Sequence, residues 1–139
     1  MGSVLADISI TGTDLATNTA TNVNPTNEAT KAIYTDTTAD AATGTPDMTA
    51  GTDSGSSNTD SITSDTTPDF TISCVTGSTV TLYDNVTSLG TGLCAGSTVT
   101  ITSSTLSAGT HATINATQID PAGNVSVVSA NLSIVIDTT

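Results

Sequence analysis

The sequence predicts an all-β protein, a two-sheet Greek-key β-sandwich of about seven short strands. Three observations predict this fold class. Short segments alternate apolar residues with Thr or Ser, which is the period-two pattern of half-buried strands. Turn-forming residues separate these segments at regular intervals. No stretch has helical periodicity of useful length, and the many short strands favour a sandwich over a barrel or a solenoid.

The expected strands place their inward-facing side chains at alternate positions. In chain order, the predicted inward positions are Phe70, Ile72 and Cys74, then Val80 and Leu82, then Val99 and Ile101, then Ile114, Ala116 and Gln118, and finally Leu132, Ile134 and Ile136. The predicted turns lie at 76–78, 84–85, 95–97, 107–109 and 121–124. Aromatic residues make up only 2% of the sequence and Trp is absent, so the core is expected to consist of Val, Ile, Leu and Ala.

An internal repeat divides the chain. The stretch that starts at Asp7 and the stretch that starts at His111 share an alternating strand, a turn with Asp, Ala and Asn, a second strand and a final Asp-Thr-Thr. Asp14 matches Asp120 and Asp36 matches Asp137, with a period of about 100 residues, the size of one sandwich domain.

The repeat predicts three parts of the chain. Residues 1–38 are expected to be the C-terminal hairpin of a preceding repeat, 39–45 a linker, and 46–139 a complete repeat. Because two strands cannot bury a face, the hairpin must pack on the complete domain, pair with another chain or be flexible. Residues 1–3 resemble a cloning remnant, so the natural chain, with its export signal, is expected to continue upstream.

The charge of the chain excludes two classes of partner. Lys31 is the only Lys or Arg, against 13 Asp and Glu, and the formal net charge is -12. Binding to nucleic acid or to an anionic membrane surface relies on cationic side chains, so neither is an expected partner. No apolar run is long enough to span a bilayer, and direct membrane insertion is not expected. A divalent cation would relieve the repulsion among the acidic groups; alternatively, the acidic surface only keeps the protein soluble.

Several motifs of the complete repeat resemble a known family. They are Pro46–Ala50 (PDMTA), Thr52–Thr63 (TDSGSSNTDSIT), Thr66–Pro68 (TTP), Gly77–Asp84 (GSTVTLYD), Leu106–His111 (LSAGTH), Asp120–Ser126 (DPAGNVS) and Ile136–Thr139 (IDTT). In this order they resemble the bacterial immunoglobulin-like tandem repeats of giant secreted adhesins and biofilm-associated surface proteins. The resemblance implies an immunoglobulin-like sandwich that serves as an extracellular spacer or adhesive repeat, secreted or on the bacterial surface, with calcium near the junctions between repeats.

Two groups of aspartates are the candidate calcium ligands that follow from this topology. Asp36, Asp47 and Asp120 are expected at one junction, and Asp53, Asp60 and Asp137 at the opposite pole of the domain. The loop 53–60 is rich in Asp, Ser and Asn, but it does not have EF-hand spacing. A calcium ion shared by two repeats would fix their angle and turn a flexible string into a rod. The alternative is that these carboxylates only cap the backbone of their own turns.

The two cysteines, Cys74 and Cys94, predict a disulfide, because an exported chain meets an oxidising compartment and an even number of Cys allows full pairing. The alternative is a pair of buried thiols. Antibody domains carry an inter-sheet disulfide that spans more sequence and packs on a Trp, which this chain lacks.

No enzyme is expected. His111 is the only histidine, and the sequence offers no Ser-His-Asp or Cys-His arrangement around it, so a surface position at the start of a strand is predicted. Two Asp side chains could in principle act as the acid and base of a glycosidase, but the sequence lacks the aromatic residues that line a sugar-binding groove. The leading function is therefore a structural spacer whose partners are neighbouring repeats of the same chain and possible host-cell or biofilm surface ligands. The alternatives are a module that binds a host glycan or protein through its loops, and an accessory domain of an enzyme.

Overall fold

The computed structural model describes residues 9–13, 19–23 and 35–139, and the chain forms two compact units, Met1–Thr38 and Ala39–Thr139. In the first unit, β1 (Ser9–Thr13) and β2 (Thr19–Val23) form an antiparallel hairpin with Ser9 opposite Val23 and Thr13 opposite Thr19. The turn with Asp14 lies outside the described residues, as does Lys31.

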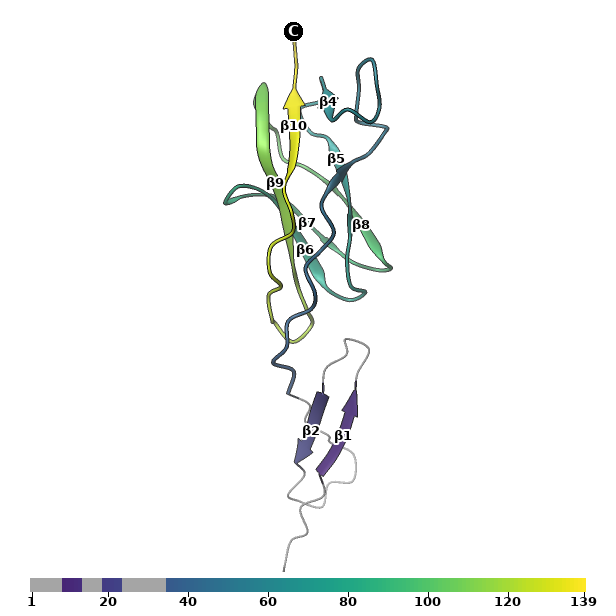
Figure 1. Cartoon of the computed structure of the whole chain (residues 1–139), viewed down its shortest axis with the longest axis vertical. Helices are drawn as coiled ribbons and strands as arrows, with labels where there is room; N and C mark the ends of the chain where they lie inside the picture. The colour runs from purple at the N-terminus through teal and green to yellow at the C-terminus, as the bar shows by residue number, and fades with distance from the viewer. Residues whose placement is uncertain (1–8, 14–18, 24–34) are drawn as a thin grey trace, which may run out of the picture. The chain divides into compact units, whose positions relative to one another are not determined.

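The second unit is a sandwich of two β-sheets (Figure 1). The five-stranded sheet has the order β4-β10-β9-β6-β7, and the three-stranded sheet has the order β3-β5-β8. The strands are β3 (Asp47–Met48), β4 (Ile62–Thr63), β5 (Asp69–Ser73), β6 (Thr79–Asp84), β7 (Thr87–Leu93), β8 (Thr98–Thr102), β9 (Gly109–Ile119) and β10 (Leu132–Ile136). The all-β sandwich predicted from the sequence is confirmed, with two very short strands, β3 and β4, in addition to six longer ones.

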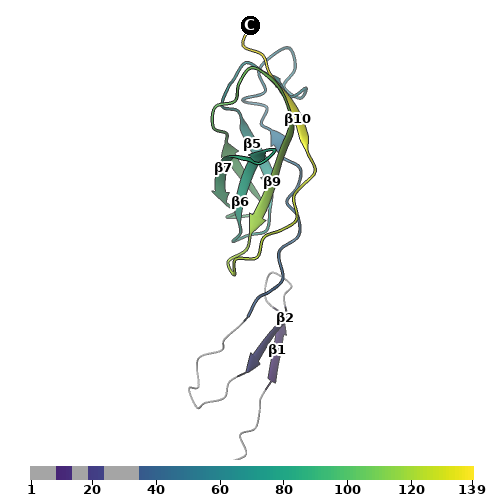
Figure 2. The same ribbon diagram turned by 90° about the vertical axis from the view of Figure 1, so that its left-hand side faces the viewer.

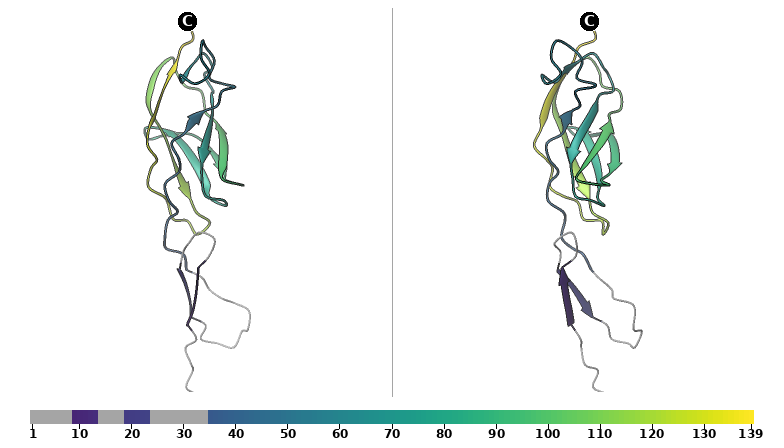
Figure 3. Two further views of the ribbon diagram at one scale, coloured as in Figure 1. Left: turned by 45° about the vertical axis from the view of Figure 1, so that its right-hand side comes forward. Right: turned by 90° about the vertical axis from the view of Figure 1, so that its right-hand side faces the viewer.

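The connections repeatedly cross from one sheet to the other. Consecutive strands lie in opposite sheets in the pairs β5–β6, β7–β8 and β8–β9 (Figure 3). Neighbouring strands within each sheet are antiparallel, except that β10 runs parallel to β4. Figure 2 shows β7, β6, β9 and β10 side by side in the larger sheet. Across the described ranges, the chain has no helix long and apolar enough to cross a membrane.

The core lies between the two sheets and consists of the residues that alternate along the strands. Most predicted inward positions are buried: Phe70, Ile72, Val80, Leu82, Ile101, Ile114, Ala116, Gln118, Ile134 and Ile136. Cys74, Val99 and Leu132 are partly buried and pack against this core. The sequence pattern did not single out Met48, Leu89 and Leu106, which are also buried. Phe70 is fully buried, and the rest of the core is mainly aliphatic, as predicted.

Two glycines let the sheets approach each other closely. A Cβ atom on Gly92 of β7 would lie 2.7 Å from the Cγ2 atom of Val99 on β8. A Cβ atom on Gly90 would lie 2.9 Å from the Cγ2 atom of Ile101 on the same strand. Any larger residue at these two positions would therefore push β7 away from β8.

The chain enters and leaves the second unit at opposite ends of β9. At the end that we name the N-terminal pole, Ile119 of β9 pairs with Thr79, and Asp40 is bonded to Ser78. At the other end, the C-terminal pole, β9 pairs with Ile136, close to the last residue. The 11 residues of β9 span about 35 Å between these poles (Figure 1).

Residues 39–45, for which the sequence predicted a linker, are attached to the second unit. The Ser78 hydroxyl donates to Asp40, the Gln118 amide donates to the Ala41 carbonyl at 2.7 Å, the Thr43 hydroxyl donates to the Ala116 carbonyl at 3.3 Å, and the Gly44 amide donates to the Ser73 carbonyl at 3.0 Å. The segment thus lies along the sandwich and forms part of this unit.

The approach of β7 to β8 can be tested with Gly92→Ala. We expect the substitution to lower the free energy of unfolding by about 1–3 kcal/mol, because the added methyl group overlaps Val99. Urea denaturation measures this loss. Gly51→Ala is the matched control, since no atom lies within 4 Å of its added Cβ and its stability should not fall. Equal stabilities for the two variants would contradict the close approach of the sheets.

Candidate functional site

The six predicted calcium ligands are distributed over both units. Asp36 belongs to the first unit, Asp120 follows β9 at the N-terminal pole, and the others lie on β3, in the loop to β4 and after β10. In the ranges that the structure describes, no group of three or more His, Cys, Asp or Glu side chains is arranged to hold a metal ion. The assignment of these six residues as calcium ligands stays a prediction.

Asp120 is bonded to its own turn. Its Oδ1 atom accepts hydrogen bonds from the backbone amides of Ala122 and Asn124, and its Oδ2 atom accepts one from the Asn124 side chain, all at 2.9 Å. The bond from the Asn124 side chain, together with those from the backbone, lowers the pKa of Asp120. This carboxylate therefore stabilises the turn between β9 and β10.

Three of the other predicted ligands also bond to backbone amides two residues further along the chain. Asp36 accepts from Thr38, Asp60 accepts from Ile62 and Asp137 accepts from Thr139. The backbone bond from Thr139 lowers the pKa of Asp137. These are the Asx-turn bonds that the alternative interpretation expected.

Asp53 differs from these residues because it is buried, with only 4% of its surface exposed. Its Oδ2 atom accepts a hydrogen bond of 3.1 Å from the backbone amide of Ser61. Ser61 has a φ of 61°, so this bond stabilises a left-handed conformation that a residue with a side chain adopts rarely. The Oδ1 atom of Asp53 is buried without a hydrogen-bond partner, which is unusual for a carboxylate oxygen.

Asp47 and Asp53 line one pocket of about 160 Å³ beside β3. Its other lining residues are Met48, Ala50, Asn58, Thr59 and Ser61. The sequence prediction assigned Asp47 and Asp53 to different clusters, whereas the structure brings them to the same pocket. Two carboxylates with Asn, Thr and Ser provide oxygen ligands of the kind that hard divalent cations prefer.

A second pocket, of about 280 Å³, lies at the C-terminal pole. Asp137 and Thr139 line it together with residues of the 52–61 loop and of β4, namely Ser54, Gly55, Ile62, Thr63 and Ser64. Asp137 thus lies beside the loop that contains Asp53. Asp137 is the only carboxylate among the lining residues, so this pocket offers less charge to a cation than the first.

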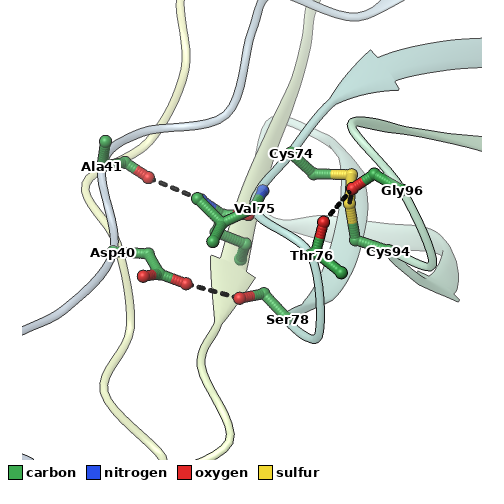
Figure 4. The surroundings of a disulfide bond; sticks show 9 residues. Asp40, Ala41, Cys74, Val75, Thr76, Ser78, Cys94 and Gly96 are labelled. Atoms are coloured by element: carbon green, nitrogen blue, oxygen red, sulfur yellow. Dashed lines mark hydrogen bonds between the residues drawn. A yellow bond between two sulfur atoms is a disulfide. The ribbon is translucent and has the colours of Figure 1, made fainter. Parts of the chain in front are cut away.

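Cys74 and Cys94 form a disulfide with a Cα–Cα distance of 6.1 Å. Cys74 follows β5 of the three-stranded sheet and Cys94 follows β7 of the five-stranded sheet, so the bond joins the two sheets near the N-terminal pole (Figure 4). The predicted disulfide is therefore present in the structure. Like the disulfide of antibody domains it joins the two sheets, but it spans fewer residues of the sequence.

The turn that follows Cys74 is held from two sides (Figure 4). On one side, the Thr76 hydroxyl donates to the Gly96 carbonyl. On the other side, Ser78 donates to Asp40, and the buried Gln118 accepts from the Val75 amide at 2.9 Å. Sequence reasoning placed Gln118 on the inward face but did not find Asp40, because its partner Ser78 is 38 residues away in the chain.

His111 lies in a polar cluster with Asp84. Its Nδ1 atom is 2.6 Å from Asp84 Oδ2 and its Nε2 atom is 3.0 Å from the Ser107 carbonyl oxygen, while the Thr113 hydroxyl donates to Asp84 Oδ1 at 2.8 Å. Partial burial acts to lower the pKa of His111, but the bonds to Ser107 and Asp84 raise it overall. Partial burial also acts to raise the pKa of Asp84, and the bonds from His111 and Thr113 lower it overall. The protonated ring satisfies both acceptors, so the cluster is an ion pair and a structural contact.

The chain was compared with known proteins. A family model for the bacterial Ig-like domain matches residues 38–138. Among solved structures, the BSP domain of a biofilm associated protein is similar at 22% sequence identity and a TM-score of 0.46, over 71% of this chain. The similar region spans 15% of the length of that structure's chain. No curated protein matches the chain.

Removal of the disulfide should destabilise the second unit. We expect the double variant Cys74→Ala/Cys94→Ala to lose about 3 kcal/mol of unfolding free energy, because the unfolded chain is no longer restricted by a closed loop of this length. Urea denaturation with and without dithiothreitol measures the effect. The reductant should destabilise the wild-type chain and leave the variant unchanged; a wild-type midpoint that ignores the reductant would contradict a stabilising disulfide.

The His111 cluster predicts a dependence of stability on pH. Because the pKa of His111 is raised in the folded state, its contribution is complete below the unfolded value of 6.5 and is lost as the pH rises through the folded value. Both side chains reach solvent, so we expect His111→Gln to cost about 1 kcal/mol near pH 5.5. Urea denaturation of both proteins should show this difference shrinking by pH 9. A difference that grows with pH would contradict the ion pair.

Proposed function

Because the chain belongs to the family of bacterial immunoglobulin-like domains, we propose that it is a structural repeat of a bacterial adhesin. In this proposal the domain is an extracellular spacer without enzymatic activity, either secreted or on the cell surface, and its immediate partners are neighbouring repeats of the same chain. It would support cell adhesion or biofilm formation by holding an adhesive part of a longer protein away from the cell.

The observation that carries this proposal is the position of the chain ends within the second unit. Residues 39–44 join the sandwich at the N-terminal pole and β10 leaves it at the C-terminal pole, with the 11-residue β9 between them. Domains with ends at opposite poles add nearly the full length of a strand to a tandem array, about 35 Å for this β9. A domain with adjacent ends would add much less length for the same number of residues.

The hairpin of the first unit supports a tandem arrangement. Thr13 pairs with Thr19 in this hairpin, and Ile119 pairs with Val125 in the second unit. In both pairs the two partners are separated by six positions, and an aspartate follows the first partner in the sequence. Equal turn lengths at matching positions are expected if residues 1–38 end a preceding repeat, which is the second element of our proposal.

Calcium is the third element of the proposal. The chain has a net charge of -12, and aspartates lie near both poles of the second unit, with Asp120 at one pole and Asp137 at the other. Cations that bind where repeats meet would reduce the repulsion between neighbouring repeats and limit the angles that they adopt. We propose calcium because the available ligands are oxygen atoms.

A ligand-binding module is the second candidate function. Val125, Val127 and Val128 are between 55% and 74% exposed and lie close together in the connection from β9 to β10. Exposed apolar side chains are possible anchors for a protein or glycan ligand. We rank this function second because binding anchors are most often large aromatic or Arg side chains, and this segment contributes only valines.

Small-angle X-ray scattering on chains of two and four tandem copies tests the spacer function. We expect the maximum dimension to grow in proportion to the number of copies, and to be larger and better defined in millimolar calcium than in EGTA. Magnesium at the same concentration is the control for ionic strength. Compact particles whose dimension does not follow the copy number would contradict the spacer, and identical curves in calcium and EGTA would contradict the role of calcium at the junctions.

A further inference from the structure

We propose that the Cys74–Cys94 disulfide is a redox switch that controls the attachment of residues 39–44, which we name the N-terminal strap. With the bond intact, the strap bonds to both sheets; with the bond reduced, the strap becomes mobile while the two sheets stay folded. This switch is a property of the second unit alone, and only its effect on a tandem chain rests on the proposed spacer function.

The N-terminal strap bonds to both sheets. On the three-stranded sheet, the Gly44 amide donates to the Ser73 carbonyl of β5 at 3.0 Å. On the five-stranded sheet, the Thr43 hydroxyl donates to the Ala116 carbonyl of β9 at 3.3 Å. The two sheets must therefore keep their separation at this place for the strap to keep both bonds.

Gln118 of β9 makes the strap depend on the turn that follows β5, residues 74–78. The side-chain oxygen of Gln118 accepts from the Val75 amide at 2.9 Å, and its side-chain nitrogen donates to the Ala41 carbonyl at 2.7 Å. Gln118 is only 1% exposed, so water does not replace either bond while the turn stays in place. A buried amide that loses one partner is costly, so a shift of the turn would also disturb the bond to Ala41.

The disulfide holds the other side of the 74–78 turn, where it joins the turn between β7 and β8 (Figure 4). Two hydrogen bonds act beside it: the Thr76 hydroxyl donates to the Gly96 carbonyl at 2.6 Å, and the Gly77 amide donates to the Cys94 carbonyl at 2.7 Å. Thr76, Gly77 and Gly96 are exposed, so water competes for these bonds. The disulfide is covalent, and water cannot replace it.

Asp40 attaches the strap to the last residue of the same turn. The Ser78 hydroxyl donates to the Asp40 carboxylate, and both residues are buried. Ser78 is itself bonded to the end of β7, because the Cys94 amide donates to its carbonyl at 2.9 Å. We expect Ser78 to keep its position after reduction. Asp40 alone would not hold the strap, since water reaches its carboxylate once the rest of the turn has moved.

A small thiol reductant can reach the bond through Cys74, which is partly exposed, whereas Cys94 is fully buried. The reductant's thiolate attacks the Cys74 sulfur, the S–S bond breaks, and Cys94 leaves as a thiolate that takes up a proton. A second thiol then displaces the first from Cys74, so both cysteines become thiols and the reductant is oxidised to a disulfide. The Cys94 sulfur lies 3.2 Å from the Gly96 carbonyl oxygen, so the reduced thiol has an acceptor in its buried position.

A mobile strap would lengthen the connection between repeats of a tandem chain. Once unbonded, the strap can extend over about 20 Å. In a spacer, oxidation outside the cell would therefore shorten and stiffen each connection, and reduction would loosen it.

NMR relaxation of the backbone amides of the full chain, oxidised and in dithiothreitol, tests the switch. In the oxidised chain we expect order parameters of about 0.85 for residues 40–44 and for β9. Reduction should lower the values of residues 40–44 below about 0.6, while β9 stays near 0.85 because the sandwich remains folded. The double variant Cys74→Ala/Cys94→Ala should have the mobile strap without any reductant.

Ser78→Ala and Ser103→Ala are a matched pair of variants for the oxidised chain. Each removes the hydroxyl of a buried serine, but only the Ser78 hydroxyl donates to the strap. The Ser103 hydroxyl has no hydrogen-bond partner among the residues that the structure describes. Ser78→Ala should lower the order parameter of Asp40 with the disulfide intact, and Ser103→Ala should leave it unchanged.

The switch is overturned if residues 40–44 are as rigid in the reduced chain as in the oxidised chain. It is also overturned if reduction unfolds the whole sandwich, which far-UV circular dichroism would report, or if Ser78→Ala leaves Asp40 as rigid as Ser103→Ala does. The spacer function fails separately. A strap that reduction mobilises in the single chain, together with compact tandem copies in scattering, would support the switch and contradict the spacer.

Discussion

Close contact between two sheets across small side chains is the constraint on which the rest of the second unit depends. Phe70 is fully buried, and most other core residues are aliphatic. Gly90 and Gly92 allow β7 to approach β8 because they have no Cβ atom. Other interactions act at the N-terminal pole, where the Cys74–Cys94 disulfide joins the two sheets and hydrogen bonds of Asp40 and Gln118 attach residues 39–45.

Those interactions are polar or covalent, and this explains which parts of the fold the sequence could predict. Period-two alternation identified the longer strands and most of the core, because each strand has one buried face. The same pattern does not reveal how residues 39–45 attach to the sandwich, which is through Asp40 and through the amide of Gln118. Hydrogen bonds between distant polar residues leave no periodic signal in the sequence, so this segment was assigned to a linker.

The sequence shows which aspartates are candidate ligands, but not which of them line one pocket. Asp60 and Asp137 make the turn bonds expected of aspartate, and their local sequence is sufficient to predict them. The position of Asp47 depends instead on strand pairing. Asp47 lies opposite Thr71 of β5, and this register places it beside the loop that contains Asp53. Two residues of β3 are too few for the sequence to specify that register, so the two carboxylates were assigned to different clusters.

The arrangement at the poles also determines how a tandem chain would carry tension. Force at the N-terminal pole reaches the sandwich through residues 39–44, which bond to Ala116 and Gln118 of β9. Force at the C-terminal pole reaches it through β10, which pairs with β9 and, in parallel, with β4. Ladder hydrogen bonds lie across the strands, so tension along the strands loads many of them together instead of opening them one by one. A spacer built in this way resists extension through the pairing of β9.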